Sequence, residues 1–472
     1  MIDIDSNILR TIDCSFEDFF TSSNNPGLVY GISYKGTVIH SGSFGSRTLL
    51  PLQAMEQDSI SRIASMTKSF ACAAVLQLRD RGLLDINAPL SSLVARLPLA
   101  EQFKTASLRD LMAMRLDLPV DDPWADRLLG ASDSTLESYF NTPLLRAGVG
   151  SSTCSYSNIS YMLLGRVIRE VCGQPAMEYI SEQILLPLGL HDTVWNVSKA
   201  HQARQAAGYR VDTMPQQEEQ HFECQSDGVV FGGLWSTIKD LAVWLEFLRA
   251  GDSGIPSWET VLSKESRREL WQPYSWYPTR TERSLITAQP ITSKAHYGFG
   301  LVIHTILGAD YIAHSGGLPG YGSHMRFDPV SGLGVIALGN GTYCRAAAPC
   351  ASALHHLALS CESPLLTRFD TVIQMGYKVA EFILQGAVEV RPDLFSYNVW
   401  QDTRPDSFAR ETRDTIAERQ GEIRVESVAC ISGYEGEIVF TGSATRKKLS
   451  YTLAPIAPPR VQSIAWVADQ AR

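Results

Sequence analysis

One short stretch, Ser61 to Phe70, constrains this chain more than any other. Ser65 and Lys68 stand three residues apart at its centre, and a run of mostly small and apolar residues follows until Arg81-Gly82. Residues three apart share one face of a helix, and a glycine just past the last periodic residue is a common helix end. The pattern predicts a buried helix on which the amine of Lys68 reaches the hydroxyl of Ser65.

This pairing is the arrangement of an activated serine nucleophile. A desolvated, partly neutral lysine can take the proton of a neighbouring hydroxyl. The start of the helix adds free N–H groups and a positive dipole end where an oxyanion would form. The alternative is an ordinary helix-capping serine with a surface lysine, which the motif alone does not exclude.

A second match to Ser-x-x-Lys shows why the motif needs support. Ser236 and Lys239 have the same spacing. Here Thr237 followed by Asp240, ahead of an apolar run, predicts a capped helix start with a solvated Lys239. We therefore interpret only the first match as functional.

Length and charge narrow the class of protein. A chain of 472 residues exceeds the usual single core, so one large domain plus a smaller one is expected. The net charge of -9 argues against nucleic acid or an anionic membrane surface as a partner. We see no signal-like N-terminal segment, no membrane-spanning apolar run and only scattered cysteines, nine in all. These features predict a cytoplasmic protein without a membrane anchor.

The apolar pattern indicates a sheet built from both ends of one large domain. Residues 27–42 predict a β-hairpin, and about 83–208 a mainly helical subdomain. Runs within 297–338 predict consecutive strands, the first at 297–305, and a helix follows at 346–359. We therefore expect an antiparallel sheet completed by distant segments, within a domain of residues 1–360.

The character of the chain changes after about residue 361. Residues 361–386 contain an amphipathic pattern that predicts a linking helix. A polar stretch at 401–423 precedes four β-like runs. We assign residues 387–472 to a small β-rich accessory domain.

Two further motifs carry chemistry that a Ser-x-x-Lys enzyme needs. Tyr156-Ser157-Asn158 stands at a predicted helix start. A tyrosine beside a lysine can be held partly as phenolate and shuttle a proton, and the asparagine amide can orient a substrate carbonyl or the lysine. The alternative is a half-buried aromatic residue with a helix cap.

The third motif, His314-Ser315-Gly316-Gly317, ends a predicted strand. Small residues there let a substrate backbone approach the strand edge, and the N–H of Gly317 can serve as an oxyanion donor beside that of Ser65. The alternative is a glycine-rich turn with a surface histidine.

Together and in this order, the motifs resemble those of the penicillin-recognising serine hydrolases, in the branch that holds class C β-lactamases, family VIII carboxylesterases and D-amino-acid-specific peptidases. The resemblance covers roughly residues 15–360. It implies the β-lactamase/transpeptidase-like α/β (α+β) fold, an antiparallel sheet flanked by helices with an inserted all-helical subdomain. It also implies no metal or organic cofactor.

The resemblance also implies roles for individual residues. Ser65 is the nucleophile, Lys68 and Tyr156 form the acid–base pair, and the order in which these two act stays open. The backbone amides of Ser65 and Gly317 form the oxyanion hole. The remaining motif residues are expected to bind substrate: Asn158, His314, Ser315 and Gly316.

One departure from the family pattern affects the expected substrate. His314 stands where β-lactamases and cell-wall peptidases have a lysine that helps hold the substrate carboxylate. An imidazole is shorter and mostly neutral near pH 7, which weakens the case for carboxylate binding. Relatives with histidine there are often esterases or act on D-amino-acid amides.

We therefore expect a serine hydrolase that acts on a small-molecule ester or amide. The main alternative is an acyltransferase or thioesterase of secondary metabolism, which shares the first half-reaction. A β-lactamase is less favoured, because His314 replaces the lysine of that pattern. A catalytically silent scaffold that kept the fold is also less favoured, because all three motifs are intact.

Overall fold

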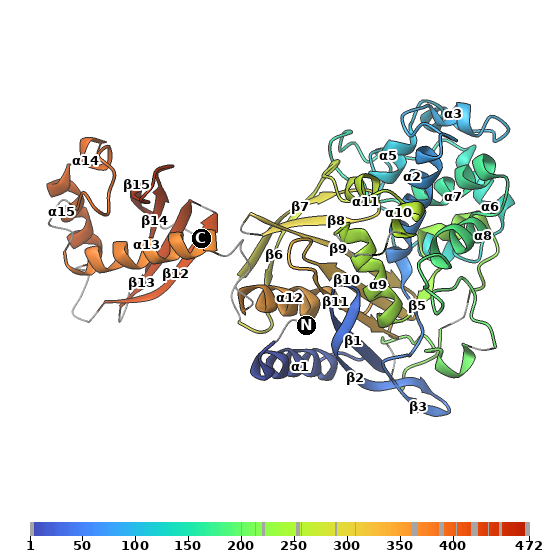
Figure 1. Cartoon of the computed structure of the whole chain (residues 1–472), viewed down its shortest axis with the longest axis horizontal. Helices are drawn as coiled ribbons and strands as arrows, with labels where there is room; N and C mark the ends of the chain where they lie inside the picture. Colours follow the sequence, from blue (N-terminus) through green and yellow to red (C-terminus); the bar gives the residue numbers. More distant parts are fainter. Residues whose placement is uncertain are drawn as a thin grey trace. The chain divides into compact units, whose positions relative to one another are not determined.

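The computed structural model describes residues 4–199, 201–212, 214–219, 222–251, 255, 257–287, 290–306, 308–360, 367–386, 391–402, 404–416, 423–432, 434–442 and 446–467. The chain divides into two compact units (Figure 1). The first unit comprises residues 1–306 and 310–358, and the second comprises residues 359–472 with the short segment 307–309.

A nine-stranded sheet forms the centre of the first unit. Its strands, in their order across the sheet, are β3 (Leu52–Ala54), β2 (Thr37–Leu49), β1 (Gly27–Tyr34), β11 (Leu333–Gly339), β10 (Tyr321–Phe327), β9 (Ala309–Leu318), β8 (Val302–Ile306), β7 (Pro290–Tyr297) and β6 (Ser275–Arg283). The early strand β1 lies antiparallel between its hairpin partner β2 and the late strand β11. The predicted antiparallel sheet, completed by distant segments, is confirmed.

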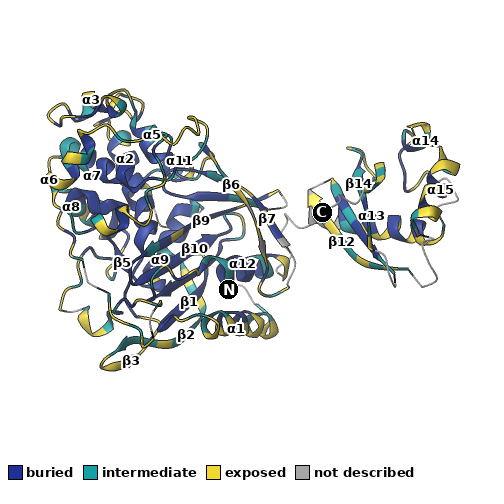
Figure 2. Ribbon diagram, turned by 180° about the vertical axis from the view of Figure 1, so that it is seen from behind, coloured by how far each residue is buried: buried dark blue, intermediate teal, exposed yellow. Residues whose placement is uncertain are grey.

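Helices cover both faces of this sheet. The ring of Phe16 on α1 (Ser6–Thr21) stacks on Tyr30 of β1 with ring centroids 3.9 Å apart. The next residue of β1, Gly31, faces Ile238 of α9 (Ile238–Arg249), and successive strand residues point to opposite faces. Figures 1 and 2 show α12 (Ala347–Ser360) beside α1, over strands that are almost wholly buried.

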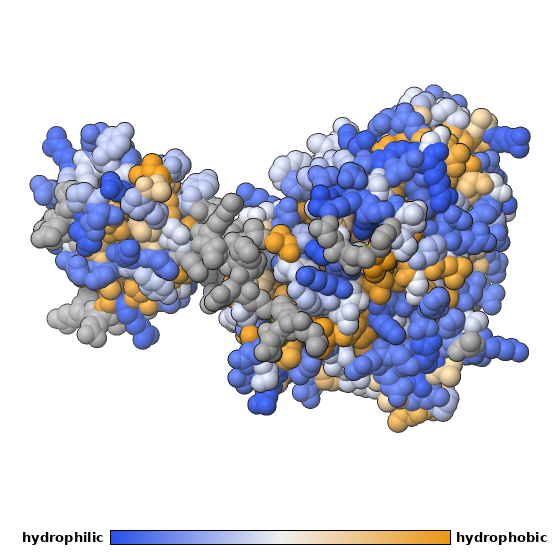
Figure 3. Space-filling model, viewed as in Figure 1, coloured by the Kyte–Doolittle hydropathy of each residue, from blue (hydrophilic) through white to orange (hydrophobic). Residues whose placement is uncertain are grey.

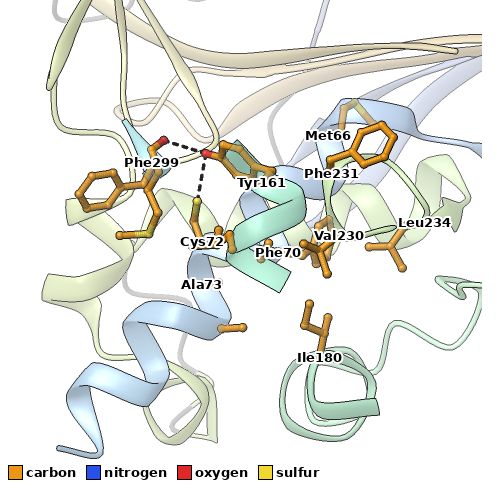
Figure 4. Close-up of a cluster of buried hydrophobic side chains, with 14 of the residues drawn as sticks. Met66, Phe70, Cys72, Ala73, Tyr161, Ile180, Val230, Phe231, Leu234 and Phe299 are labelled. Carbon is orange, nitrogen blue, oxygen red and sulfur yellow. Dashed lines mark hydrogen bonds between the residues drawn. The ribbon is translucent and has the colours of Figure 1, made fainter. Parts of the chain in front are cut away.

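The helical part of the first unit packs around one buried helix, α2 (Thr67–Asp80). Figure 4 shows part of this core, in which the hydroxyl of Tyr161 lies 3.2 Å from the sulfur of Cys72 on α2. The other helices of this part are α3 (Leu90–Leu93), α4 (Glu101–Lys104), α5 (Leu108–Met112), α6 (Asp133–Phe140), α7 (Asn158–Cys172), α8 (Ala176–Ile180), α10 (Ser257–Val261) and α11 (Lys264–Glu269). Short helical segments join them at Ala125–Leu128, Ser181–Leu185, Gln202–Arg204 and Asp227–Phe231.

The second Ser-x-x-Lys match is a helix start, as predicted. The hydroxyl of Thr237 caps α9 and accepts a hydrogen bond from the backbone N–H of Asp240 at 3.2 Å. Ser236 is buried and its hydroxyl lies 2.9 Å from that of Thr193, whereas Lys239 is exposed. Serine and lysine therefore do not meet at this site.

The second unit is a four-stranded antiparallel sheet with helices. Its strands follow in sequence order, β12 (Arg424–Ser432), β13 (Glu435–Thr441), β14 (Arg446–Leu453) and β15 (Val461–Val467). Its helices are α13 (Thr367–Leu384), α14 (Val399–Asp402) and α15 (Pro405–Ile416). The hydroxyl of Tyr451 on β14 donates to the carbonyl of Val372 on α13 at 2.6 Å, so α13 belongs to the core of this unit and is not a separate link.

This packing predicts where the chain can be shortened. A chain that ends at residue 386 keeps α13 but loses the sheet that buries Val372, Val379 and Phe382. We expect this chain to aggregate, whereas a chain that ends at residue 360 stays monodisperse, because exposed apolar faces drive association. Size-exclusion chromatography of the two chains checks this, and identical elution behaviour would contradict it.

Figure 3 shows a face on which hydrophilic residues dominate and hydrophobic residues gather in small groups. No helix in the described ranges combines the length and the apolar character needed to cross a bilayer.

Candidate active site

Two hydrogen bonds hold the backbone of Ile63, which directly precedes the turn that carries Ser65. The N–H of Ile63 donates to the carbonyl of Leu234 at 3.0 Å. The carbonyl of Ile63 accepts from the hydroxyl of Ser323 on β10 at 2.8 Å. Ser65 is thereby tied to the sheet as well as to the helical part.

The helix start differs from the prediction by one short turn. Ser65 lies in a 3-10 turn, Ala64–Met66, and α2 begins at Thr67. Ala64 has a φ of 48°, a left-handed conformation that costs a non-glycine residue energy and often occurs at functional sites. The predicted helix end is confirmed, since α2 stops at Asp80 and Gly82 has a φ of 73°.

Lys68 is completely buried and meets three oxygen atoms. Its Nζ lies 2.8 Å from Oγ of Ser65, 2.7 Å from Oδ1 of Asn158 and 2.8 Å from the carbonyl oxygen of Phe231. The rings of Tyr156, Tyr161 and Phe231 surround it, with centroids 4.9 to 5.5 Å away. The predicted contact between Ser65 and Lys68 is therefore present.

These contacts set the direction of the lone pair on a neutral Lys68 amine. The amide oxygen of Asn158 and the carbonyl of Phe231 can only accept, so each keeps one N–H of the amine. The hydroxyl of Ser65 can also donate, so the lone pair of the neutral amine faces Ser65. Burial lowers the pKa of Lys68 to about 8, against the opposing effect of nearby aspartates, so a useful fraction is neutral close to physiological pH.

Tyr156 lies beside this pair but is not a phenolate. Burial raises its pKa well above the ordinary value, and the charges of Asp122 and neighbouring tyrosines act in the same direction, whereas a hydrogen bond with Ser65 opposes them. The expectation of a partly ionised Tyr156 is therefore wrong for the free protein. Its phenol is a proton donor in this state.

Asn158 lies behind Lys68 and is fully buried. Its Nδ2 donates to Oδ1 of Asp122 at 2.5 Å and to Oδ1 of Asp126 at 3.1 Å. The backbone N–H of Asn158 donates to Asp121, which caps the start of α7. Of the two roles considered for this amide, the contact with Lys68 is present.

His314 is buried and both of its ring nitrogens have partners. Nδ1 lies 2.6 Å from the carbonyl oxygen of Ser315, which can only accept, so Nδ1 carries the proton. Nε2 therefore accepts from the hydroxyl of Tyr297 at 3.2 Å. Burial, together with the charge of Lys68, lowers the pKa of His314 to about 3, so the imidazole is neutral.

The glycines of the third motif allow a close approach of backbone. A Cβ on Gly316 would lie 2.2 Å from the carbonyl oxygen of Ile63, and one on Gly317 would lie 2.7 Å from the ring of Tyr343. Ser315 is exposed, and its Oγ lies 2.8 Å from Nδ1 of His324. There is therefore no room for a side chain where β9 passes the turn Ala64–Met66.

A cavity of about 760 Å³ opens over these residues. Its walls include residues of all three motifs and of the segment after β11, among them Ser65, Tyr156, His314, Ser315, Gly316, Gly317 and Tyr343. Lys68 and Asn158 are not part of its walls. Ser65 therefore faces a space large enough for a small molecule, with Lys68 beneath it.

Several residues of the site were not identified from the sequence. These are Asp121, Asp122 and Asp126, the carbonyl of Phe231, and Tyr343. The pair Asp121-Asp122 before Pro123 was the one visible signal, because adjacent carboxylates within a mainly apolar region need partners. Among the residues with described positions, no group of His, Cys, Asp or Glu has the arrangement of a metal site.

The geometry agrees with what comparison with known proteins shows. The profile of the family named Beta-lactamase matches residues 13–358, which is most of the chain. The chain belongs to the Beta-lactamase family. Solved structures show the same fold for this family member. The octameric penicillin-binding protein homologue from Pyrococcus abyssi superposes with a TM-score of 0.61 at 20% identity, covering 98% of this chain and 94% of the other.

A class C β-lactamase from Rhodobacter sphaeroides superposes with a TM-score of 0.59 at 20% identity, covering 74% of this chain and 99% of the other. Both likenesses concern the fold.

Three curated proteins are similar to this chain over part of its length. Penicillin-binding protein 4* of Bacillus subtilis is 22% identical over 307 residues, 61% of this chain. The D-alanyl-D-alanine-carboxypeptidase/endopeptidase AmpH of Escherichia coli is 28% identical over 204 residues, 41% of this chain, and unguisins hydrolase ungD' of Aspergillus campestris is 22% identical over 308 residues, 62% of this chain. The chain spans 50% to 62% of the length of these relatives.

Proposed function

We propose that this protein is a serine hydrolase that forms an acyl-enzyme at Ser65 from a small-molecule ester or amide and releases the acyl group to water. The observation that carries the proposal is the 2.8 Å contact between Oγ of Ser65 and Nζ of Lys68 at the wall of the cavity. The family membership supports it, because the relatives include proteins named as a carboxypeptidase and a hydrolase.

The site supports the following sequence of proton transfers. Neutral Lys68 takes the proton of Ser65 as Oγ attacks the substrate carbonyl carbon, and backbone N–H groups of Ser65 and Gly317 stabilise the oxyanion. Tyr156 protonates the leaving group and is reprotonated by Lys68, so the proton of Ser65 ends on the released alcohol or amine. Water then attacks the ester of Ser65 through the same groups in reverse.

The neutral His314 favours a substrate without a carboxylate at this position. Its imidazole is uncharged and held by Tyr297 and the Ser315 carbonyl, so it offers no cation to an anionic group. An ester or amide of the esterase or D-amino-acid amidase type fits this wall better than a β-lactam carboxylate does.

Intact-protein mass spectrometry after brief exposure to p-nitrophenyl acetate tests the proposal. We expect one acetyl adduct on the wild type and on Ser236→Ala, but none on Ser65→Ala, because the buried hydroxyl of Ser236 has no lysine beside it. An adduct on Ser65→Ala, or loss of the adduct in Ser236→Ala with the fold intact, would place the nucleophile elsewhere. No adduct on any of the three proteins would remove the support for ester hydrolysis.

A further inference from the structure

A carboxyl group that the reaction above does not use lies behind the catalytic pair. Asp126, in the turn Ala125–Leu128, is only 2% exposed. One of its oxygens accepts from Nδ2 of Asn158 at 3.1 Å, and the other accepts from the hydroxyl of Tyr343 at 2.9 Å. A buried carboxylate is costly, so its two hydrogen-bond donors need an explanation. One of them, Asn158, also contacts Lys68.

Tyr343 connects this carboxyl group to the opposite wall of the cavity. It follows β11, far along the chain from Asp126, and has a φ of 52°, which is strained for a residue with a side chain. Its ring lies against Gly317, where an added Cβ would come within 2.7 Å. One side chain therefore touches both the expected oxyanion strand and the carboxyl group behind Asn158.

We propose that Asp126 and Tyr343 are positioning residues that set the orientation and the basicity of Lys68 through Asn158. This inference rests on the proposed function. Asp122 and Asp126 both accept from Nδ2, so the amide of Asn158 must turn its oxygen toward Lys68. That oxygen occupies one N–H of the amine, which leaves the lone pair for Ser65. Tyr343 fixes Asp126 in turn.

The same carboxylates also set the charge balance at Lys68. The titratable groups with a Coulombic interaction with Lys68 are Asp121, Asp122, Asp126, Cys72 and His314. The groups that face Asp126 are Asp121, Asp122, Lys68 and Tyr343, with Arg127 next to Tyr343. Each aspartate favours the charged ammonium, so removing one negative charge makes Lys68 neutral at a lower pH. Burial raises the pKa of Asp126 to about 7, so its charge changes at a pH close to neutral.

The variant Asp126→Asn separates positioning from simple structural support. It keeps the shape and an acceptor oxygen but removes the charge. The acid limb of kcat/KM for p-nitrophenyl acetate reports the base of the free enzyme, and we expect its midpoint to fall by about one pH unit relative to the wild type. Tyr343→Phe removes the donor that lowers the pKa of Asp126, so the midpoint moves the same way by less. Glu101→Gln, at an exposed site in the helical part, should leave it unchanged.

A second measurement does not depend on turnover. The titration of Lys68 is followed by NMR of protein that carries ¹³C-labelled lysine, with its signal assigned by its loss in Lys68→Met. The inference predicts a lower titration midpoint in Asp126→Asn and in Tyr343→Phe. Midpoints equal to that of the wild type in both variants, by rate or by NMR, would overturn it. If the wild type fails to hydrolyse the ester, the proposed function falls, and the NMR titration still decides this inference.

Discussion

Replacing Lys68 by methionine is expected to lower kcat/KM for an activated ester by about 10²- to 10⁴-fold, the range typical of a lost general base. Methionine keeps a similar length and an unbranched side chain in a fully buried site but has no lone pair basic enough to take the proton of Ser65. The carbonyl of Phe231 and Oδ1 of Asn158 lose their donor at the same time. Steady-state kinetics checks the rate, and thermal unfolding checks that the variant is folded.

The chain offers a matched control for this substitution. Lys239→Met changes the lysine of the other Ser-x-x-Lys match, which is exposed. We expect its kcat/KM to equal that of the wild type. A folded Lys68→Met protein that keeps wild-type activity would show that Lys68 is not the base and would shift that role toward Tyr156.

Replacing Gly165 by alanine is expected to destabilise the protein by about 2 to 3 kcal/mol, as overpacking of a tight core does. Gly165 lies within α7, where alanine normally improves helix stability by roughly 1 kcal/mol. Here the new Cβ would lie 1.9 Å from the carbonyl oxygen of Asp227, so the two segments must separate. Urea-induced unfolding measures the change in the free energy of unfolding.

This substitution should also affect the site. The segment Asp227–Phe231 carries the carbonyl that binds Lys68, and α7 begins at Asn158, its other partner. Moving the two apart disturbs both acceptors. Gly130→Ala is the control, because the nearest atom to its Cβ would be a ring carbon of Phe222 at 3.4 Å, an ordinary van der Waals distance, and we expect a change within about 0.5 kcal/mol. Equal stabilities of the two variants would contradict the argument.

Several predictions that held depend only on neighbours along the chain. The spacing of Ser65 and Lys68 is one helical turn, so their contact follows from helix geometry. The cap at Thr237 is equally local. The four β-like runs of the accessory unit are also strands, β12 to β15, because their apolar runs are separated by turn residues.

One local pattern misled the prediction and one helix was not predicted, both for physical reasons. The strand predicted at 297–305 is two strands, β7 and β8, because Gly300 has a φ of 70° and passes so close to Lys68 that a Cβ would meet its backbone at 2.7 Å. The polar stretch at 401–423 contains α15, which buries only a few residues such as Phe408 and Thr412. Few apolar residues give little periodicity to detect.

The sequence by itself determined the fold family and the contact between Ser65 and Lys68, because both depend on short-range spacing and on motif order. Only the tertiary structure brought Tyr343 to Asp126, 217 positions apart in the chain, and Asp126 to Asn158. It also decided the protonation of the site. Burial makes Lys68 a weaker base, keeps His314 neutral and keeps Tyr156 protonated, and burial is a property of the whole packed core that no local pattern contains.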